Sequence, residues 1–194
     1  MRKIVSFVHL SLDGFVASTA KGSAGLGWIS RSADLFEYVE KRIQQTDTAL
    51  YGRTTFEMME SYWPTAADKP DASPHDHEHS RWYKSARKVV LSKTLLEKNH
   101  ANTKIISSNL SDEINKLKHS SGSEILIFGS PSATHALMAE NLIDGYWLFV
   151  NPILLGQGFP LFKNIKDKTA LMLVNSKIFP SGVVCLQYEM KRNQ

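Results

Sequence analysis

The hydrophobic positions of the chain form short apolar runs that alternate with stretches of helical periodicity. An apolar, β-rich run over residues 3–11 ends at an Asp-Gly turn pair, which predicts a first strand. After a loop rich in Gly, Ser and Ala, apolar residues recur at helical spacing over 30–46, and Ser32 is the expected N-cap of that helix. The chain therefore opens with a strand followed by a helix.

The same alternation continues to the end of the chain. Strands are expected within 48–52, 87–94, 103–108, 124–129 and 144–156, and helices within 53–63, 110–122 and 131–142. Two final runs, 169–179 and 183–191, flank a Pro-Ser-Gly turn and predict an antiparallel hairpin. Strands that alternate with helices pair in parallel through right-handed crossovers. The pattern predicts one α/β domain over 1–194, with a mixed, mostly parallel central sheet and a C-terminal antiparallel hairpin.

Residues 64–81 break this pattern. They contain three prolines and many polar groups with almost no apolar periodicity, so we expect a long surface loop. Within it, His75, His77 and His79 alternate with acidic residues, and in an extended segment the three imidazoles would share one face. Because a proline-rich loop holds no ligand set rigidly, the interpretation is a solvated loop and no metal site is predicted.

Composition narrows the class of protein. The 194 residues are 42% hydrophobic and 22% charged, which is ordinary for a globular domain that folds around one core. No apolar stretch is long enough to span a membrane, and the N-terminal run is too short for a signal peptide, so a cytoplasmic protein without a membrane partner is expected. The single Cys185 excludes an internal disulfide.

The net charge of +4 fits an anionic small molecule better than a nucleic acid. The basic residues occur singly or in pairs, without the long stripe that nucleic-acid binding favours. No nucleic-acid partner is therefore expected.

Two strand ends in the first half of the chain have the character of a phosphate site. The stretch ALYGRTTFE joins Gly52, which lets the backbone pass close to a ligand, to the cationic fork of Arg53 and the hydroxyls of Thr54 and Thr55. The alternative is an ordinary Gly-containing turn with a surface arginine and two threonines at a helix start. In KVVLSK, Ser92 and the following lysine, Lys93, emerge at the end of an apolar run.

A third strand end is ILIFGSPSAT, where Gly129 precedes a helix start with Pro131 at its favoured first position. Ser130 and Ser132 flank that start. The Gly-x-Gly-x-x-Gly fingerprint and the Walker lysine motif are both absent from the sequence. On its own, the stretch indicates only a strand that meets a helix at a glycine.

Six stretches in order along the chain resemble the dihydrofolate reductase superfamily, in the branch of the C-terminal reductase domain of the bifunctional riboflavin-biosynthesis deaminase-reductase. They are SLDGFVA, GWIS, ALYGRTTFE, KVVLSK, ILIFGSP and LIDGYWLFVNPILLGQGFPLF. The resemblance implies a dihydrofolate reductase-like three-layer fold that binds NADPH at its strand ends and a small-molecule substrate beside the nicotinamide. It also implies a homodimer, as does the apolar character of the run GYWLFVNPILL.

The resemblance further implies roles for individual residues. Arg53, Ser92 and Lys93 would surround the adenosine 2′-phosphate, and Thr54 and Thr55 would support the pyrophosphate. The other cofactor-binding residues would be Gly52, the phosphate-side group Gly129, Ser130, Pro131 and Ser132, and the nicotinamide contacts Val8, Val16 and Ala17. Trp28 would bind the substrate.

The implied chemistry is hydride transfer from NADPH to a pteridine or a ribosylamino-pyrimidine. Asp34 lies near the place of the carboxylate that binds the pteridine in dihydrofolate reductases, and Asp13 is the other catalytic candidate. Each has an ordinary explanation, since a helix dipole stabilises Asp34 and a turn accounts for Asp13.

Two departures from the family pattern bear on these expectations. Ser130 stands where dihydrofolate reductases carry the second of two consecutive glycines, which are often joined by a cis peptide. One cysteine cannot build the zinc site of the deaminase domain, so a stand-alone reductase domain is expected. The alternative to a reductase is a non-catalytic nucleotide-binding or dimerisation module of the same fold.

Overall fold

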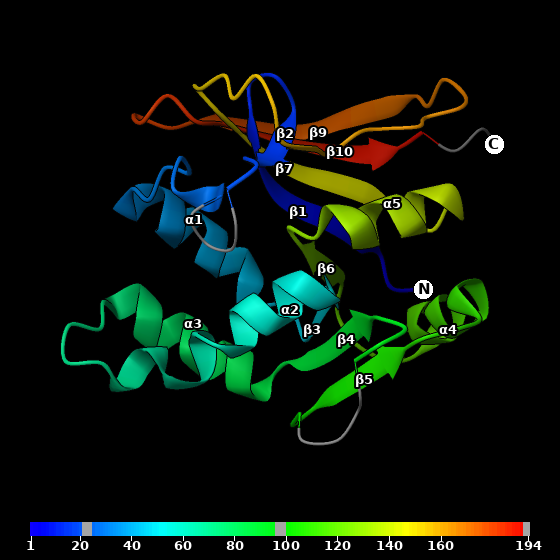
Figure 1. Cartoon of the computed structure of the whole chain (residues 1–194), viewed down its shortest axis with the longest axis horizontal. Coiled ribbons are helices and arrows are strands. Elements are labelled where there is room, and N and C mark those ends of the chain that lie inside the picture. The colour runs from blue at the N-terminus through cyan, green and yellow to red at the C-terminus, as the bar shows by residue number, and fades with distance from the viewer. Residues whose placement is uncertain (21–24, 96–99, 192–194) are drawn as a thin grey trace. The chain divides into compact units, whose positions relative to one another are not determined.

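The computed structural model describes residues 1–20, 25–95 and 100–191. Its main feature is an eight-stranded sheet in the order β5-β4-β3-β6-β1-β7-β10-β9 (Figure 1). β1 pairs in parallel with β7, β3 with β4 and β4 with β5, whereas β10 pairs antiparallel with β7 and β9. The predicted mixed, mostly parallel sheet and C-terminal hairpin are confirmed.

The chain divides into two compact units. Unit 1 comprises residues 1–2 and 31–126, and unit 2 comprises 3–30 and 127–194. The single-domain expectation stays a prediction. Among the described residues, no helix combines the length and the apolar character that crossing a membrane requires.

Unit 1 contains the helices and strands that lie between β2 and β6 along the chain. Its elements are α1 (Ala33–Ile43), β3 (Thr48–Gly52), α2 (Arg53–Glu60), the 3-10 helix η2 (Trp63–Asp68), α3 (Pro74–Ser85), β4 (Arg87–Leu91), β5 (Thr103–Ile106) and α4 (Leu110–His119). The spaced apolar residues Leu35, Val39 and Ile43 of α1 are all buried, as the periodicity predicts. Ser32 occupies the N-cap position of α1, but its hydroxyl makes no capping hydrogen bond.

Unit 2 contains β1 (Ile4–Ser11), β2 (Phe15–Ala17), α5 (Pro131–Ala139), β7 (Gly145–Asn151), β8 (Phe159–Pro160), β9 (Leu171–Ile178) and β10 (Val184–Met190). β6 (Ile125–Phe128) crosses the boundary between the units. β2 and β8 form a separate two-stranded antiparallel sheet. Aromatic rings of β1 and β7 pack together in the core, with Phe7 and Trp147 4.7 Å apart between ring centroids.

The long surface loop expected over 64–81 is wrong. That segment contains most of η2 and most of α3. α3 begins with a capping box, because the Ser73 hydroxyl accepts from the Asp76 amide at 3.2 Å and the Asp76 carboxylate accepts from the Ser73 amide at 2.9 Å. Pro74 takes the first helical position, where its missing N–H costs no hydrogen bond.

The strand expected over 144–156 is shorter than predicted and is not a sheet edge. β7 ends at Asn151, immediately before Pro152, which has no N–H to donate to a ladder. It lies between β1 and β10 and is almost wholly buried. The apolar character of GYWLFVN therefore reflects a central strand, so it no longer supports a homodimer.

Candidate functional site

The turn between β3 and α2 brings together four of the predicted cofactor residues. Gly52 is the N-cap of α2 in an extended conformation, and as a glycine it supplies no side-chain cap. Arg53 and Thr54 are exposed, and Thr55 is half-buried. The Arg53 guanidinium donates to Glu57 Oε1 at 2.7 Å and to Thr94 Oγ1 at 2.7 Å, so it links the start of α2 to the segment after β4.

The end of β4 lies in the same unit and forms a compact polar turn. The Ser92 hydroxyl accepts from the amides of Thr94 at 3.2 Å and Leu95 at 3.0 Å. A hydroxyl that accepts twice still has its own hydrogen to donate. Lys93 is exposed beside it. Through the bond between Arg53 and Thr94, the structure joins these two predicted strand ends in unit 1.

In unit 2, the turn between β6 and α5 has an unusual backbone. Gly129 and Ser130 are consecutive residues in the left-handed region, with φ of 55° and 43°. The peptide bond between them is trans, since no described residue follows a cis bond. A non-glycine residue in this region costs about 1 kcal/mol or more, so the left-handed Ser130 is a strained position of the backbone.

The same turn leaves the start of α5 open. Ser130 is buried and its side chain makes no capping hydrogen bond to α5. Nothing lies within 4 Å of the position that a Cβ on Gly129 would occupy. Pro131 takes the first helical position and Ser132 is exposed on the first turn. The backbone amides of this helix start can therefore face an anion.

The predicted nicotinamide contacts lie on β1 and β2. Val8 and Val16 are buried, with side chains 2% and 4% exposed, and Ala17 is half-buried. Trp28 is half-buried and donates from its indole nitrogen to the Gly25 carbonyl at 2.8 Å. Their roles toward cofactor and substrate stay predictions.

The two acidic candidates have different surroundings. The Asp13 carboxylate accepts from the amides of Gly156 at 2.7 Å and Leu155 at 3.1 Å, so it ties its turn to the loop after β7. Hydrogen bonding to Ser11, and then to these amides, lowers the pKa of Asp13 below its usual value. Asp34 is exposed in the first turn of α1. The Asp13 carboxylate is therefore stabilised in its ionised form and holds two loops together, whereas the Asp34 side chain is exposed and can contact a ligand.

A polar pair at the ends of β1 and β7, the half-buried His9 and the buried Asn151, escaped the sequence reasoning. The His9 ring stacks on Phe149 at 4.9 Å, and burial lowers the pKa of His9 to about 4. Asn151 Nδ2 lies 3.4 Å from His9 Nδ1, and Asn151 Oδ1 accepts from the Ser30 amide at 3.0 Å. No short motif marks these residues in the sequence, because their proximity follows from the parallel register of β1 and β7.

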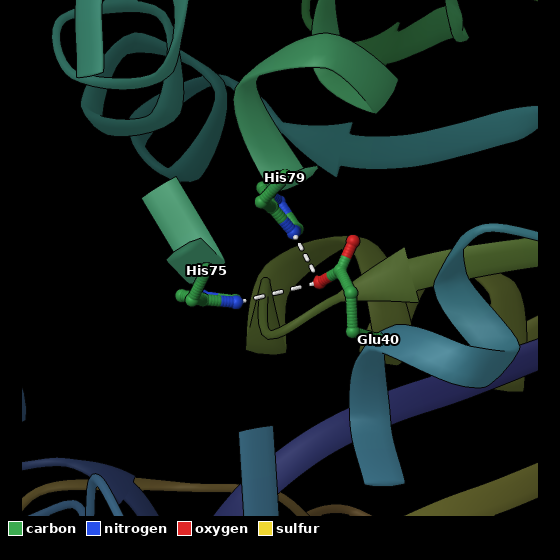
Figure 2. A group of neighbouring side chains, drawn as sticks. All are labelled: Glu40, His75 and His79. Carbon is green, nitrogen blue, oxygen red and sulfur yellow. Dashed lines mark hydrogen bonds and ion pairs between the residues drawn. The ribbon is translucent and has the colours of Figure 1, made fainter. Parts of the chain in front are cut away.

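A second group lies wholly in unit 1 and includes two histidines that the sequence analysis assigned to a solvated loop. His75 and His79 of α3 both direct Nδ1 toward the same oxygen of Glu40 on α1, at 3.5 and 3.2 Å (Figure 2). His77, which an extended segment would place with them, is exposed and outside the group. The spacing His-x-x-x-His is the signal that could have revealed the pair, because residues four apart share one face of a helix.

A mostly parallel eight-stranded sheet, with polar turns at the ends of β3, β4 and β6, defines a protein of the α/β class. A family model of the RibD C-terminal domain matches residues 2–185. The chain belongs to this family, which agrees with the dihydrofolate reductase-like fold expected from its sequence.

Two known proteins of similar length resemble the chain over nearly its whole length. The uncharacterized protein YyaP of Bacillus subtilis is 32% identical over 188 residues, which cover 96% of this chain and 94% of that protein. A solved structure from Shewanella sp. PV-4, provisionally named a riboflavin biosynthesis protein, has a TM-score of 0.71 at 22% identity and covers 98% of this chain and 99% of its own.

A longer protein shares the fold as part of its chain. It is the diaminohydroxyphosphoribosylaminopyrimidine deaminase/5-amino-6-(5-phosphoribosylamino)uracil reductase of Thermotoga maritima. The match has a TM-score of 0.66 at 12% identity and covers 97% of this chain but 56% of the Thermotoga chain. At these identities, the two solved structures establish the fold alone.

Proposed function

We propose that the protein is an NADPH-dependent reductase that acts on a pteridine or a ribosylamino-pyrimidine. Membership of the RibD C-terminal domain family supports a reductase, and the activity named for the Thermotoga maritima relative supports the substrate class. When bound, NADPH supplies a hydride from C4 of its nicotinamide to an imine or a related acceptor. The protein must bind the cofactor and the substrate, orient them toward each other and exclude water from the site.

The observation that carries the proposal is the turn between β6 and α5. The start of α5 has no side-chain cap, so its first turn presents backbone amides and the positive end of the helix dipole beside the left-handed turn of Gly129 and Ser130. The open space beside Gly129 lets an anion approach these amides closely. Such a cradle suits the pyrophosphate of a dinucleotide, and we assign Ser132 a hydroxyl contact there.

In unit 1, we assign the adenosine 2′-phosphate to Arg53, Ser92 and Lys93. Two cationic side chains and a hydroxyl with a hydrogen to donate match a dianionic phosphate. Arg53 is held by Glu57 and Thr94 at 2.7 Å each, which limits its rotamer freedom before a ligand arrives. Thr54 and Thr55, in the first turn of α2, would support a neighbouring phosphate by their hydroxyls and amides.

On the substrate side, we assign ring binding to Asp34. It is exposed, whereas Asp13 is engaged by backbone amides and keeps its negative charge at neutral pH. A carboxylate whose pKa is lowered is a poor proton donor near neutrality. Asp13 would instead fix the turn of residues 11–17 against the loop after β7, and so hold the predicted nicotinamide contacts Val16 and Ala17.

The engagement of Asp13 also favours the second candidate, a non-catalytic nucleotide-binding or dimerisation module. One of the two acidic residues proposed for catalysis has a sufficient structural explanation. Such a module would bind NADPH but would not oxidise it with any pterin or aminouracil substrate.

We also propose a homodimer that forms through β9. This edge strand is exposed over nearly its whole length, and Met172, Leu173, Val174 and Ile178 are each more than half exposed, at 53%, 52%, 53% and 77%. A long, apolar edge strand invites pairing with another chain. A second copy of the chain would cover it.

The experiment that tests cofactor binding at the β6–α5 turn compares two glycines of the same unit. Gly129 and Gly182 both have positive φ, 55° and 82°, and Gly182 lies between β9 and β10 and has no assigned role toward the cofactor. Each change to alanine should cost about 1 to 2 kcal/mol of stability through backbone strain. Only Gly129→Ala should also weaken NADPH binding, by at least tenfold in titration calorimetry. Equal affinities of the two variants for NADPH would remove the phosphate role of this turn.

A further inference from the structure

The cluster of Glu40, His75 and His79 joins α1 to α3, and none of these three residues has a role in the proposed reductase function. Glu40 lies in α1, and both histidines lie one turn apart on the buried side of α3 (Figure 2). Their side chains are 5%, 21% and 7% exposed, so the group is nearly closed to solvent and is least covered beside His75.

The separations between the facing atoms match those of ligands around one small cation. Ligand atoms about 2.0 to 2.1 Å from a tetrahedral Zn²⁺ lie about 3.3 to 3.4 Å from one another. Glu40 Oε2 lies 3.2 Å from His79 Nδ1 and 3.5 Å from His75 Nδ1. The atoms that the three residues offer to a metal all lie within 4.8 Å of each other. No ligand therefore has to move far to surround an ion.

The three side chains are also of the types that ligate metals, since a carboxylate and a neutral imidazole both present lone pairs to a cation.

The pattern of hydrogen bonds leaves a place for that cation. Nδ1 of His75 is buried and has no hydrogen-bond partner among the described residues. A buried polar atom of this kind is unfavourable unless a ligand satisfies it. Gln44 Nε2 donates to the other Glu40 oxygen at 2.6 Å, which orients the carboxylate as an outer partner of a metal ligand does.

Aromatic rings hold both imidazoles in position. His75 stacks on Phe36 with ring centroids 4.3 Å apart and an interplanar angle of 8°. Trp63 packs against His79 at 4.0 Å and against His75 at 5.6 Å. Rings fixed by packing lose little further freedom when they bind an ion, and a dry surrounding strengthens the attraction of the carboxylate for a cation.

We infer that Glu40, His75 and His79 form a binding site for one first-row divalent transition-metal ion of the zinc type. Two imidazoles and one carboxylate are a donor set that such ions accept, and hard cations such as Mg²⁺ prefer oxygen alone. Three protein ligands leave a fourth position for water or a small anion. The ion would clamp α1 to α3 within unit 1, independently of any cofactor.

The test uses the untagged full chain, stripped with chelator and titrated with Zn²⁺ or Co²⁺ alone. We expect one equivalent per chain by calorimetry, and the visible d–d absorption of four- or five-coordinate Co²⁺. At free Zn²⁺ of 100 times Kd, the Tm should rise by about 5 to 10 °C. The absence of saturable binding up to millimolar metal would overturn the inference and leave a metal-free carboxylate–histidine cluster.

Three variants locate the site. Glu40→Gln and His75→Phe should each weaken Co²⁺ binding at least tenfold, and phenylalanine keeps the ring that stacks on Phe36. His77→Ala, on the exposed side of the same helix, should bind as the unchanged protein does. Far-UV circular dichroism confirms that each variant is folded. Unchanged binding by both ligand variants, or an equal loss in His77→Ala, would refute the assignment.

Discussion

Replacing Arg53 by alanine should separate recognition of NADPH from recognition of NADH. The Arg53 side chain is 49% exposed, and its ion pair with Glu57 joins residues four apart on α2. An exposed pair of this kind contributes about 0.3 to 0.5 kcal/mol, so Arg53→Ala should reduce the free energy of unfolding by less than about 1 kcal/mol. The fold should therefore remain intact while the ligand contact is lost.

The magnitude for the cofactor follows from the contact that we assign to this side chain. Hydrogen bonds to a charged group contribute about 1.5 to 3 kcal/mol, and about 1.4 kcal/mol corresponds to a factor of ten. Loss of Arg53 should raise the Kd for NADPH by about 10- to 100-fold. NADH has no 2′-phosphate, so its Kd should change by less than about twofold. Titration calorimetry of both cofactors at one fixed ionic strength measures the difference.

Glu57→Gln is the matched control for this experiment. It removes the carboxylate that holds Arg53 at 2.7 Å but leaves the guanidinium in place. Removal of a negative charge beside a phosphate site should leave NADPH affinity unchanged or raise it. If Arg53→Ala weakens both cofactors equally or weakens neither, Arg53 has no role at the 2′-phosphate.

Three further predictions concern stability and assembly. The pKa of His9 is lowered from 6.5 to about 4 in the folded protein, so on acidification the His9 imidazole is protonated in the unfolded chain before it is protonated in the folded chain. The free energy of unfolding should therefore fall by up to about 3 kcal/mol as the pH drops from 6.5 to 4. Urea unfolding of His9→Phe should show a smaller fall over that range; an identical pH dependence would contradict the neutral imidazole. Leu173→Lys on β9 should convert the proposed dimer to a monomer in sedimentation, and a native protein that is already monomeric at micromolar concentration would exclude this interface. Ser73→Ala should remove the capping box of α3 and cost about 1 kcal/mol in denaturant unfolding, whereas no measurable loss would show that the cap is unimportant.

Elements with a clear apolar period were predictable from the sequence. α1 was expected because Leu35, Val39 and Ile43 repeat at helical spacing, and all three are buried. α3 was missed because its buried face is built from His79, Ser80, Trp82 and Tyr83, in which polar residue types occupy inward positions. The polar inward face concealed the period, and the capping residues Ser73 and Asp76 were the remaining signal of a helix start.

In the candidate site, too, some features could be predicted from the sequence and others could not. The residues next to glycine at strand ends could be proposed from local sequence, because a turn at the carboxyl end of a parallel strand is a local feature. The left-handed conformation of Ser130 could not, since serine gives no sign of positive φ. The contacts of Glu40 with His75 and of His9 with Asn151 could not be predicted either, because they depend on packing between residues that are 35 and 142 positions apart in the chain.

The most direct test of the proposed reductase is transfer of an isotope from the cofactor to a product. The protein is incubated with NADPH that carries deuterium at C4 of the nicotinamide, together with dihydropterins, folates and the aminouracil ribotide. The account predicts NADPH oxidation with one of these substrates and a product that contains one deuterium by mass spectrometry. Saturable NADPH binding without oxidation by any of them would contradict it and establish the non-catalytic module.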